Sequence, residues 1–331
     1  MIVVAGEALV DLVPQGSGGP AAALLPSRGG GPCNTAVALA RLGSPAHFCS
    51  RVSTDAFGDF LLDRLRAENV GLDLVRRGPE PTTLAVAALD GAHSAAYRFF
   101  TEGTADRLFT APPELPGAAR ALLLGSCSLV LEPGATAYET LMRHAAARGV
   151  FIALDPNIRP GLIPDPGAYR ARFTGWLPHL DVVKLSEEDA RWLGGEVDDW
   201  LAAGPAAVVV TRGRAGLTVV TRDHGTVDVP AWPVDVVDTI GAGDTVYAAL
   251  LHGLSERNAL TRAALSALTA DDWRALLTFA AHAAALTCSR AGAEPPYATE
   301  IGDPAAPRRR RPAPNSRGGA GGRPGSVPPV R

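Results

Sequence analysis

The segment Gly241-Ala242-Gly243-Asp244 places three small residues and a carboxylate directly before an apolar, helix-like run. A helix N-terminus leaves backbone N–H groups unpaired and carries about half a positive charge. Because small residues leave these groups uncovered, a phosphate group could approach them closely. Asp244 would lie in the first turn, where its carboxylate could accept a proton from an attacking hydroxyl. A plain helix cap would also explain Asp244, but Asp238 and the pattern D-T-x-G-A-G-D favour the chemical interpretation.

A second glycine-rich segment, Arg28-Gly29-Gly30-Gly31-Pro32-Cys33-Asn34, also leads into a helical pattern. Its glycines permit close approach of the backbone to a ligand, and the Asn34 amide can both donate to and accept from hydroxyl groups. Asn34 could equally serve only as a helix cap. Asp11 comes just after the first expected strand, where open α/β sheets bind ligands. Its carboxylate is therefore well placed to accept hydrogen bonds from sugar hydroxyls.

Two further polar segments each follow an apolar run. In Asp155-Pro156-Asn157-Ile158-Arg159-Pro160, Asn157 could bind hydroxyls or phosphate, and Arg159 could stabilise the charge of a transferring phosphate. The other segment is Ser186-Glu187-Glu188-Asp189. Acidic residues at a helix start are favoured by the helix dipole, which is one explanation of this segment. Water-mediated support of Mg²⁺ is the functional alternative.

The elements that must position these residues alternate between short apolar runs and helical patterns. This alternation predicts a mostly parallel sheet with helices on both faces and ligands at the carboxyl ends of its strands. A last helix over about 271–287 starts with a capping-box-like pair, Thr269 and Asp272. The expected strands are Ile2–Ala5, Ala121–Leu124, Phe151–Leu154, Val182–Lys184 and Ala207–Thr211, and the other expected helices are Asn34–Leu42, Phe57–Glu68, Ala135–Arg148, Ser186–Leu193 and Gly241–Leu254.

Two segments, residues 12–30 and 82–100, do not fit this alternation. The first shows no helical pattern, and the second predicts a hairpin with its turn at Asp90-Gly91. We expect a small sheet that projects from the main domain and covers a site, although an ordinary insertion would give the same pattern. A cover matters for phosphoryl transfer, because water must be kept from the reactive phosphate.

Composition excludes several classes of protein. The chain has 331 residues, of which 47% are hydrophobic and 20% charged, as in ordinary globular proteins. Its net charge of -3 argues against nucleic-acid binding through a general basic surface. Lys184 is the only lysine, and its neighbours do not match the G-x-x-x-x-G-K-[ST] pattern of a P-loop. The lysine-dependent apparatus of protein kinases has no candidate either.

Cysteine usage and apolar runs bear on the cellular setting. The four cysteines are scattered without a C-x-x-C pair, so neither a zinc site nor a disulfide framework is expected. The first residues predict a strand and not a signal peptide. No uncharged apolar run approaches the roughly 20 residues of a membrane span. The longest, residues 121–131, is better explained as a buried pair of strands about Gly125. We therefore expect a cytoplasmic protein that binds neither membrane nor nucleic acid.

The C-terminal segment, residues 303–331, consists of Pro, Gly, Ala and Arg with almost nothing to bury. Such a segment cannot offset its ordering entropy, so we expect it to be disordered. The run Arg308–Arg311 could contact an acidic partner, but a solvated tail without function explains it equally.

Together these residues resemble the PfkB, or ribokinase-like, family of sugar kinases from Ile2 to about Pro296. The resemblance includes both family signatures: G-G-x-x-x-N at residues 29–34 and the highly specific D-T-x-G-A-G-D at residues 238–244. Residues 51–61, 211–216 and 286–293 are also family-like. The last of these stretches, with YRFFTEGTAD at 97–106 and DPNIRP at 155–160, is most similar to the fructokinase branch.

The resemblance implies a ribokinase-like fold over residues 1–302, which is a three-layer sandwich with a mainly parallel central sheet and a small β lid. It also implies ATP-dependent phosphorylation of a small sugar, with D-fructose to fructose 6-phosphate as the leading expectation. Asp244 would be the general base, and the backbone of Gly241, Ala242 and Gly243 would form the anion hole. The implied contacts to sugar or phosphate are Asp11, Gly30, Asn34, Arg98, Asn157 and Arg159.

The resemblance further implies a nucleotide site and two kinds of cation. Mg²⁺ would accompany ATP and be supported through water by Asp189 or Glu188, although Asp189 is one methylene shorter than the family's Glu. K⁺ is a further expectation, bound by backbone carbonyls. The residues implied for ATP are Ser186, Thr211, Gly213, Gly216, Gly241 and Gly243, with region 280–292 beside adenine, and those for K⁺ are Asp238, Ile240, Thr287, Arg290 and Gly292.

Several alternatives stay open. A kinase of the same fold for 2-keto-3-deoxygluconate, ribose or a nucleoside would carry the same signatures. A non-catalytic sugar or nucleotide sensor is a different class, against which the intact Asp244 argues. A dinucleotide-binding oxidoreductase needs G-x-G-x-x-G after the first strand, which Gly6-Glu7-Ala8-Leu9 does not supply. A homodimer through the lid is also possible, since Leu84, Val86, Ala88 and Phe99 would give it an apolar face.

Overall fold

A mainly parallel sheet forms the centre of the computed structural model, which describes residues 1–15, 22–89 and 95–302. Within these residues nine strands hydrogen-bond in the order β13-β12-β11-β10-β9-β8-β1-β4-β5. All neighbours are parallel except β11–β12 and β12–β13, which are antiparallel. The strands are β1 (Ile2–Ala5), β4 (Ala46–Ser53), β5 (Gly71–Gly78), β8 (Ala121–Gly125), β9 (Phe151–Asp155), β10 (Val182–Ser186), β11 (Ala207–Thr211), β12 (Leu217–Thr221) and β13 (Gly225–Val229).

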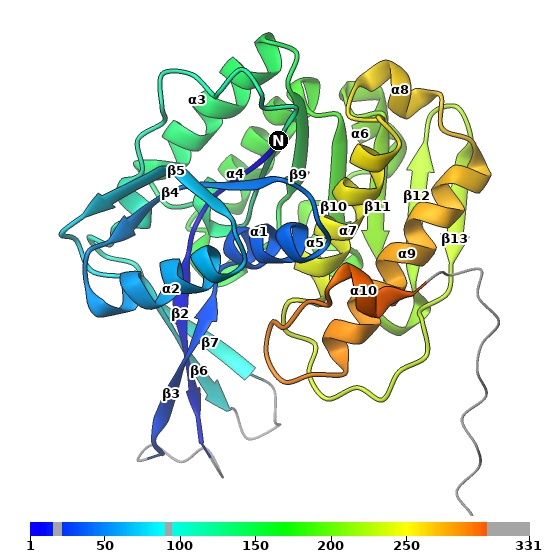
Figure 1. Ribbon diagram of the computed structural model, residues 1–331. Coiled ribbons are helices and arrows are strands. Elements are labelled where there is room, and N and C mark those ends of the chain that lie inside the picture. The colour runs from blue at the N-terminus through cyan, green and yellow to red at the C-terminus, as the bar shows by residue number, and fades with distance from the viewer. Residues whose placement is uncertain (16–21, 90–94, 303–331) are drawn as a thin grey trace, which may run out of the picture.

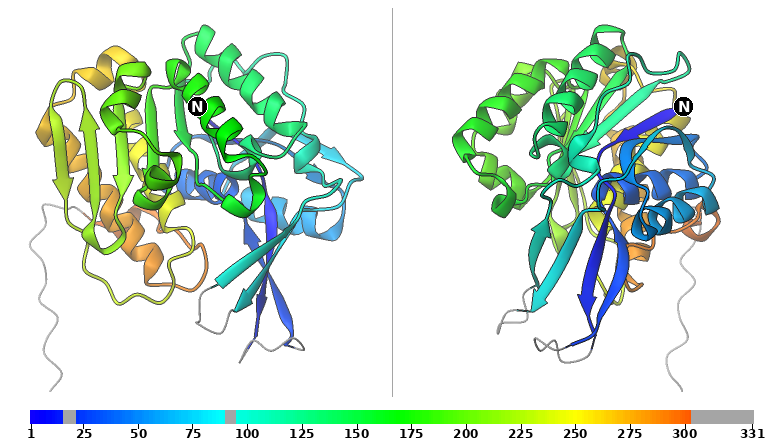
Figure 2. Two further views of the ribbon diagram at one scale, coloured as in Figure 1. Left: turned by 180° about the vertical axis from the view of Figure 1, so that it is seen from behind. Right: turned by 90° about the vertical axis from the view of Figure 1, so that its left-hand side faces the viewer.

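Helices cover both faces of this sheet and give three layers (Figures 1 and 2). Side chains alternate along a strand, so Ile2 and Val4 enter one apolar core and Val3 and Ala5 enter the other. Strands buried on both faces need almost continuous apolar runs, as the sequence has. On the first core pack α1 (Gly31–Arg41), α2 (Ala56–Ala67), α7 (Ala242–Glu256), α8 (Arg262–Ser266), α9 (Ala270–Cys288) and α10 (Ala298–Ile301), and on the second α3 (Gly134–Ala147), α4 (Pro166–Trp176), α5 (Glu187–Leu193) and α6 (Val197–Ala203).

A second sheet projects from the central one, at the lower left of Figure 1, and we call it the lid. Its strand order is β3-β2-β6-β7, with β2 and β6 parallel in the middle and an antiparallel partner outside each. The predicted hairpin of residues 82–100 is confirmed as the β6–β7 pair, while its turn at residues 90–94 lies outside the described residues. The lid strands are β2 (Leu9–Pro14), β3 (Leu24–Gly29), β6 (Leu84–Leu89) and β7 (Ala95–Phe100).

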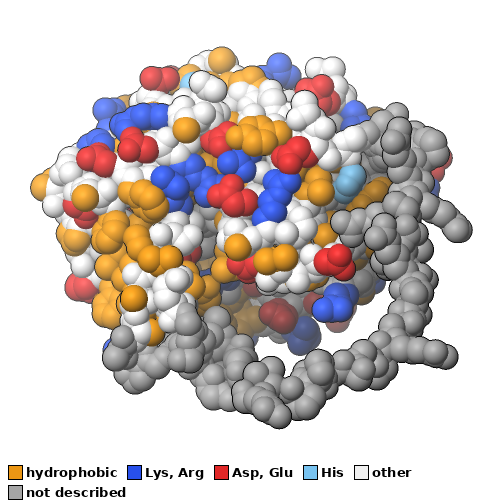
Figure 3. Space-filling view, turned by 60° about the horizontal axis from the view of Figure 1, so that its bottom comes forward, with side chains coloured by type: hydrophobic (Ala, Val, Ile, Leu, Met, Phe, Trp, Pro, Cys, Tyr) orange, Lys and Arg blue, Asp and Glu red, His pale blue; other side chains and the backbone are white. Residues whose placement is uncertain are grey.

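The lid exposes apolar side chains. Leu25 and Phe100 are 51% and 53% exposed, and Leu24 is also exposed. Hydrophobic side chains gather over this side of the molecule in the space-filling view (Figure 3). Of the apolar face expected from the sequence, Leu84 and Val86 are half-buried, Phe99 turns toward a cavity described below, and the side chain of Ala88 is not among those described.

Two local predictions have clear outcomes. The capping box at Thr269 and Asp272 is confirmed, with each side chain accepting from the backbone N–H of the other residue. The predicted strand pair over residues 121–131 is wrong, because the chain leaves β8 at Gly125 and makes a short 3-10 turn, Ser126–Leu129. Ser126 takes a positive φ of 63°, which turns the chain across the end of the sheet. Other 3-10 turns are Asp106–Leu108, Pro160–Leu162, Leu177–His179 and Gly213–Ala215.

No helix among the described residues has the length and apolar character needed to cross a bilayer. The predicted C-terminal tail, residues 303–331, lies outside the described residues.

Candidate active site

A cavity of about 290 Å³ opens between the lid and the carboxyl ends of the central strands, and we call it the acceptor cavity. It brings together Asp11, Gly30, Asn34, Asn157, Arg159, Gly241, Gly243 and Asp244, all of which the sequence singled out. Its other lining residues are Glu7, Leu9, Gly31, Tyr97, Phe99, Ser126, Cys127, Lys184, Thr239 and Ile240. The lid therefore covers the edge of the sheet at which the polar segments end.

Asp244 lies in the first turn of α7 and faces the acceptor cavity. Its Oδ2 accepts a hydrogen bond of 3.0 Å from Asn34 Nδ2, which belongs to α1. Burial raises the pKa of Asp244 above its usual value, while the Asn34 bond and the charges of Lys184 and Arg159 act in the opposite direction. A carboxylate with a raised pKa is a better proton acceptor, which suits a general base.

The turn ahead of α7 is shaped by Gly241. Its φ of 77° is left-handed, and an added Cβ would lie 2.6 Å from the Cβ of Ala293. Only glycine fits there without displacing the neighbouring chain. The first helical hydrogen bond runs from Thr245 N to Gly241 O at 2.9 Å, so the N–H groups of Gly243 and Asp244 precede it and lack an intrahelical partner. The N–H of Ala242 already donates to Thr239 O, at 3.3 Å.

Lys184, the central residue of β10, stands beside this turn. Its Nζ is 2.6 Å from Asp155 Oδ2, and both side chains are almost completely buried. Burial raises the pKa of Asp155 to about 6, against the opposing charge of Lys184. A Cβ added at Gly243 would lie 3.1 Å from Lys184 Nζ, so a positive charge adjoins the helix N-terminus. Together they make this corner of the cavity attractive to an anion.

Two more carboxyl groups face the acceptor cavity. Burial raises the pKa of Asp11 to about 6, with the charge of Arg159 lowering it and that of Asp244 raising it. Glu7 is buried, accepts hydrogen bonds from the backbone and hydroxyl of Ser128, and has a pKa raised by burial. Arg159 is exposed and donates to the side-chain oxygen of Asn157 at 2.8 Å. The cavity thus offers carboxylates, an amide and a cation within one space.

A second cavity, of about 490 Å³, lies on the other side of the α7 start, and we call it the nucleotide-sized cavity. Thr211, Gly213, Gly216 and Gly243 line it, as the sequence predicts for a nucleotide, and so does Ala242, which was expected in the anion hole. Gly241, also expected to contact ATP, lines the acceptor cavity instead. Most of its wall is apolar: Leu217, Ala231, Trp232, Pro233, Val234, Val236, Val246, Ala281, Ala284 and Ala285. Gly243 and Thr239 line both cavities, so the start of α7 separates them.

Four residues predicted to contact sugar, ATP or Mg²⁺ are not brought into these cavities. Tyr97 and Phe99 line the acceptor cavity, and Arg98 between them is exposed on the opposite face of β7. Ser186 and Asp189 form the capping box of α5, and Glu188 is exposed. Asp189 also accepts a hydrogen bond of 2.8 Å from the backbone N–H of Ile158, so it holds the loop that carries Asn157 and Arg159 in place.

The two segments expected to bind K⁺ lie side by side. Asp238 accepts from Ile240 N at 3.0 Å through one carboxylate oxygen and from Gly292 N at 2.8 Å through the other. Thr287 is fully buried, and its hydroxyl is 2.9 Å from that of Thr245 in α7. The backbone of both segments therefore converges beside the start of α7. Within the described residues no cluster of three or more His, Cys, Asp or Glu could hold a metal ion.

A model of the pfkB family carbohydrate kinases matches residues 1–300. The chain belongs to this family. It is 40% identical over 276 residues to a fructokinase from Rhizobium leguminosarum bv. trifolii, covering 81% of this chain and 84% of that protein. The structure superposes on a Xylella fastidiosa fructokinase with bound ATP at a TM-score of 0.82, with 31% identity and coverage of 91% and 96%. A Vibrio cholerae fructokinase with bound fructose, ADP and potassium superposes at a TM-score of 0.74, with 28% identity. The match covers 88% of this chain and 93% of that chain.

These findings make the protein a sugar kinase with the ribokinase-like fold that the sequence predicted. In this pfkB carbohydrate kinase, the sequence did not place Lys184, Glu7, Ser126, Tyr97 or Phe99 in the site, although all line the acceptor cavity; Phe99 was expected only on an apolar face of the lid. One available signal for Lys184 was its uniqueness in the chain, as a charged residue within a run expected to form a buried strand. The lid aromatics gave no such signal, because alternation along a strand does not tell which face meets a ligand.

Proposed function

We propose that the protein transfers the terminal phosphoryl group of ATP to a hydroxymethyl oxygen of D-fructose, giving fructose 6-phosphate. The observation that carries this proposal is the start of α7, where Gly243 lines both cavities and Asp244 faces only the acceptor cavity. A sugar in one cavity and a nucleotide in the other would meet at this turn. The names of the relatives support fructose as the acceptor.

In the proposed mechanism Asp244 accepts the proton of the attacking sugar hydroxyl. Asn34 holds the carboxylate in place through its hydrogen bond to Oδ2, which leaves Oδ1 for the substrate. Gly31 leaves room for the hydroxyl, since an added Cβ would lie 3.2 Å from Asp244 Oδ1. General-base help of this kind is worth roughly 10²–10⁴-fold in rate.

The same turn would stabilise the transferring group. The backbone of Gly241, Ala242 and Gly243 would form the anion hole: the N–H of Gly243 lacks an intrahelical partner, and that of Ala242 would exchange its 3.3 Å bond to Thr239 O for a bond to the phosphate. Lys184 and Arg159 would add positive charge. Asp11, Gly30 and Asn34 would bind the sugar hydroxyls. The apolar nucleotide-sized cavity would hold the base of ATP, and the lid would keep water from the reacting groups.

Cations enter this proposal in different ways. Both oxygens of Asp189 already accept hydrogen bonds from the protein, so Asp189 does not fit as a direct ligand of Mg²⁺, and we keep water-mediated support by Asp189 or Glu188 as the proposal. We propose that Mg²⁺ is carried by the phosphates of ATP, where it neutralises charge. The converging backbone of the two segments fits K⁺, with the carbonyls of Asp238, Ile240, Thr287, Arg290 and Gly292 as its proposed ligands.

The test is Asp244→Asn, for which we expect turnover to fall by roughly 10²–10⁴-fold while ATP binding survives. ADP release is measured with fructose, ribose, 2-keto-3-deoxygluconate and a nucleoside, each with and without K⁺. Asp271→Asn is a matched control, because Asp271 also lies in a first helical turn but is 92% exposed and outside both cavities. Near wild-type turnover in Asp244→Asn would show that Asp244 is not the general base. Faster ADP release with another acceptor than with fructose would show that fructose is not the preferred substrate.

A further inference from the structure

Helix α2 contacts the lid at one end and a segment beside the anion hole at the other. At its start, the N-cap residue Asp55 accepts hydrogen bonds from the backbone and hydroxyl of Thr82, at 2.9 and 2.7 Å, just before lid strand β6. From lid strand β3, Arg28 donates to Phe60 O at 2.9 Å, and its guanidinium lies 3.8 Å above the Phe60 ring. Two lid strands are therefore fastened to α2.

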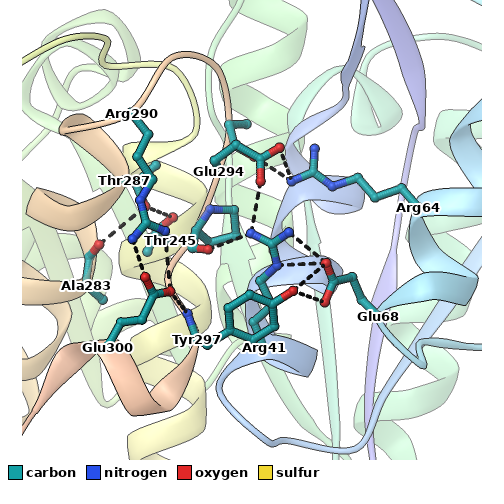
Figure 4. Close-up of polar contacts among 12 residues, drawn as sticks. Arg41, Arg64, Glu68, Thr245, Ala283, Thr287, Arg290, Glu294, Tyr297 and Glu300 are labelled. Atoms are coloured by element: carbon teal, nitrogen blue, oxygen red, sulfur yellow. Dashed lines mark hydrogen bonds and ion pairs between the residues drawn. The ribbon is translucent and has the colours of Figure 1, made fainter.

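The other end of α2 holds the segment that follows α9. Arg64 donates to Ala293 O at 2.8 Å and pairs with Glu294 at 3.1 Å (Figure 4). Arg41, the last residue of α1, binds the opposite oxygen of Glu294 at 3.0 Å and Pro295 O at 2.7 Å. The side chains of Arg41 and Arg64 are only 11% and 10% exposed, so both ion pairs are shielded from solvent on the arginine side. We call Arg41, Arg64 and Glu294 the clamp.

The clamped segment touches the anion hole directly. Ala293 packs against Gly241 so closely that a Cβ added there would lie 2.6 Å from the Ala293 Cβ. One residue earlier, Gly292 donates its N–H to Asp238 at 2.8 Å. A shift of Ala293 would therefore move the turn that begins α7. Because α2 spans its length as one hydrogen-bonded helix, a displacement of the lid end reaches this segment through Arg64.

We propose that Arg64, supported by Arg41 and Glu294, is a positioning residue that couples sugar binding under the lid to nucleotide binding at the anion hole. The proposal rests on the proposed function, because it assigns the sugar to the acceptor cavity and ATP to the opposite side of α7. When the lid closes over a bound sugar, α2 moves with β3 and β6. Through Arg64, this movement positions Ala293 against Gly241. The nucleotide then meets an anion hole that is already arranged.

The experiment measures this coupling by calorimetry on the full chain. The dissociation constant of a non-hydrolysable ATP analogue is determined with and without saturating fructose. In the wild type we expect fructose to tighten nucleotide binding about tenfold, and in Arg64→Met we expect this ratio to fall to about twofold. Arg64→Lys keeps a donor for Ala293 O and should retain most of the ratio, while Glu294→Gln should lose part of it.

Arg66→Met is the matched control, because Arg66 lies on the same helix but is exposed and pairs only with Asp63 in the described contacts. An unchanged ratio in Arg64→Met, an equal loss in Arg66→Met, or a wild-type ratio of one would each overturn the coupling. If Arg64→Met does not fold, as a thermal melt would show, the ratios in Arg64→Lys and Glu294→Gln decide. Failure of the wild type to phosphorylate any sugar would instead overturn the proposed function.

Discussion

Single carboxyl groups in the acceptor cavity should set the pH range of activity. Burial places the pKa of Asp11 at about 6, above the 3.8 of an exposed aspartate. Asp11 is therefore mostly protonated at pH 5 and mostly ionised at pH 7. A protonated carboxyl loses acceptor capacity toward sugar hydroxyls.

We predict that the KM for the sugar rises as the pH falls through about 6, because Asp11 loses its charge in that range. Asp11→Asn should show a high KM that changes little between pH 5 and 7. Steady-state kinetics at fixed saturating ATP measure both. If the KM of Asp11→Asn rises on acidification as steeply as that of the wild type, a group other than Asp11 causes the pH dependence.

Lys184 offers a second prediction, since it neutralises a buried carboxylate. Lys184→Met should lower the free energy of unfolding by about 3–5 kcal/mol at pH 8, because Asp155 would be left charged and unpaired. The folded-state pKa of Asp155 already exceeds its unfolded value, so stability associated with this group is lost as the pH rises from about 4 to 6. The penalty of the variant should therefore be smaller at pH 5. Urea unfolding at both pH values measures it.

The double variant Asp155→Asn/Lys184→Met separates stability from catalysis. It removes both charges, so it should recover much of the lost stability. Turnover should stay low, since the cation beside the anion hole is missing. Recovery of both properties together would show that Lys184 acts only on folding.

At the scale of elements, the start of α7 depends on the conformation of Gly241. Gly241→Ala should lower kcat by roughly 10²–10³-fold, because the strained φ and the contact with Ala293 would displace the anion hole. Gly149→Ala is the control: its φ of 75° is just as strained, but an added Cβ there meets nothing within 4 Å. Both variants should lose stability, measured by thermal melts, and only Gly241→Ala should lose turnover. Equal losses of turnover would refute a special role for this turn.

The main elements could be predicted from the sequence because apolar periodicity and capping residues are local. Strands β1 and β11 begin and end at the predicted residues, and α7 begins one residue after its predicted start. Contacts between distant residues could not be predicted in this way. Nothing in the sequence indicates that Asp189 fastens the Ile158 backbone, and the ends of α2 meet the lid and Ala293 only in the folded chain.

At the scale of the whole molecule, the exposed apolar side chains of the lid predict a homodimer. Leu24, Leu25 and Phe100 are too apolar to remain in water without cost, and a second lid would cover them. Sedimentation should show a dimer for the wild type and a monomer for Leu25→Glu/Phe100→Glu. Ala147→Glu, at an exposed position on α3, should leave the dimer intact. A wild type that sediments as a monomer at every concentration would end this prediction.

Because its sole lysine is buried, the folded protein should resist proteases that cleave after lysine. All other basic side chains in the chain are arginine or histidine, so the only amines are the N-terminus and Lys184. While β10 keeps its place inside the central sheet, a lysine-specific protease cannot reach the backbone at Lys184, whose side chain is 5% exposed. The rate of cleavage after Lys184 by such a protease would therefore measure how often the central sheet opens, without any engineered label.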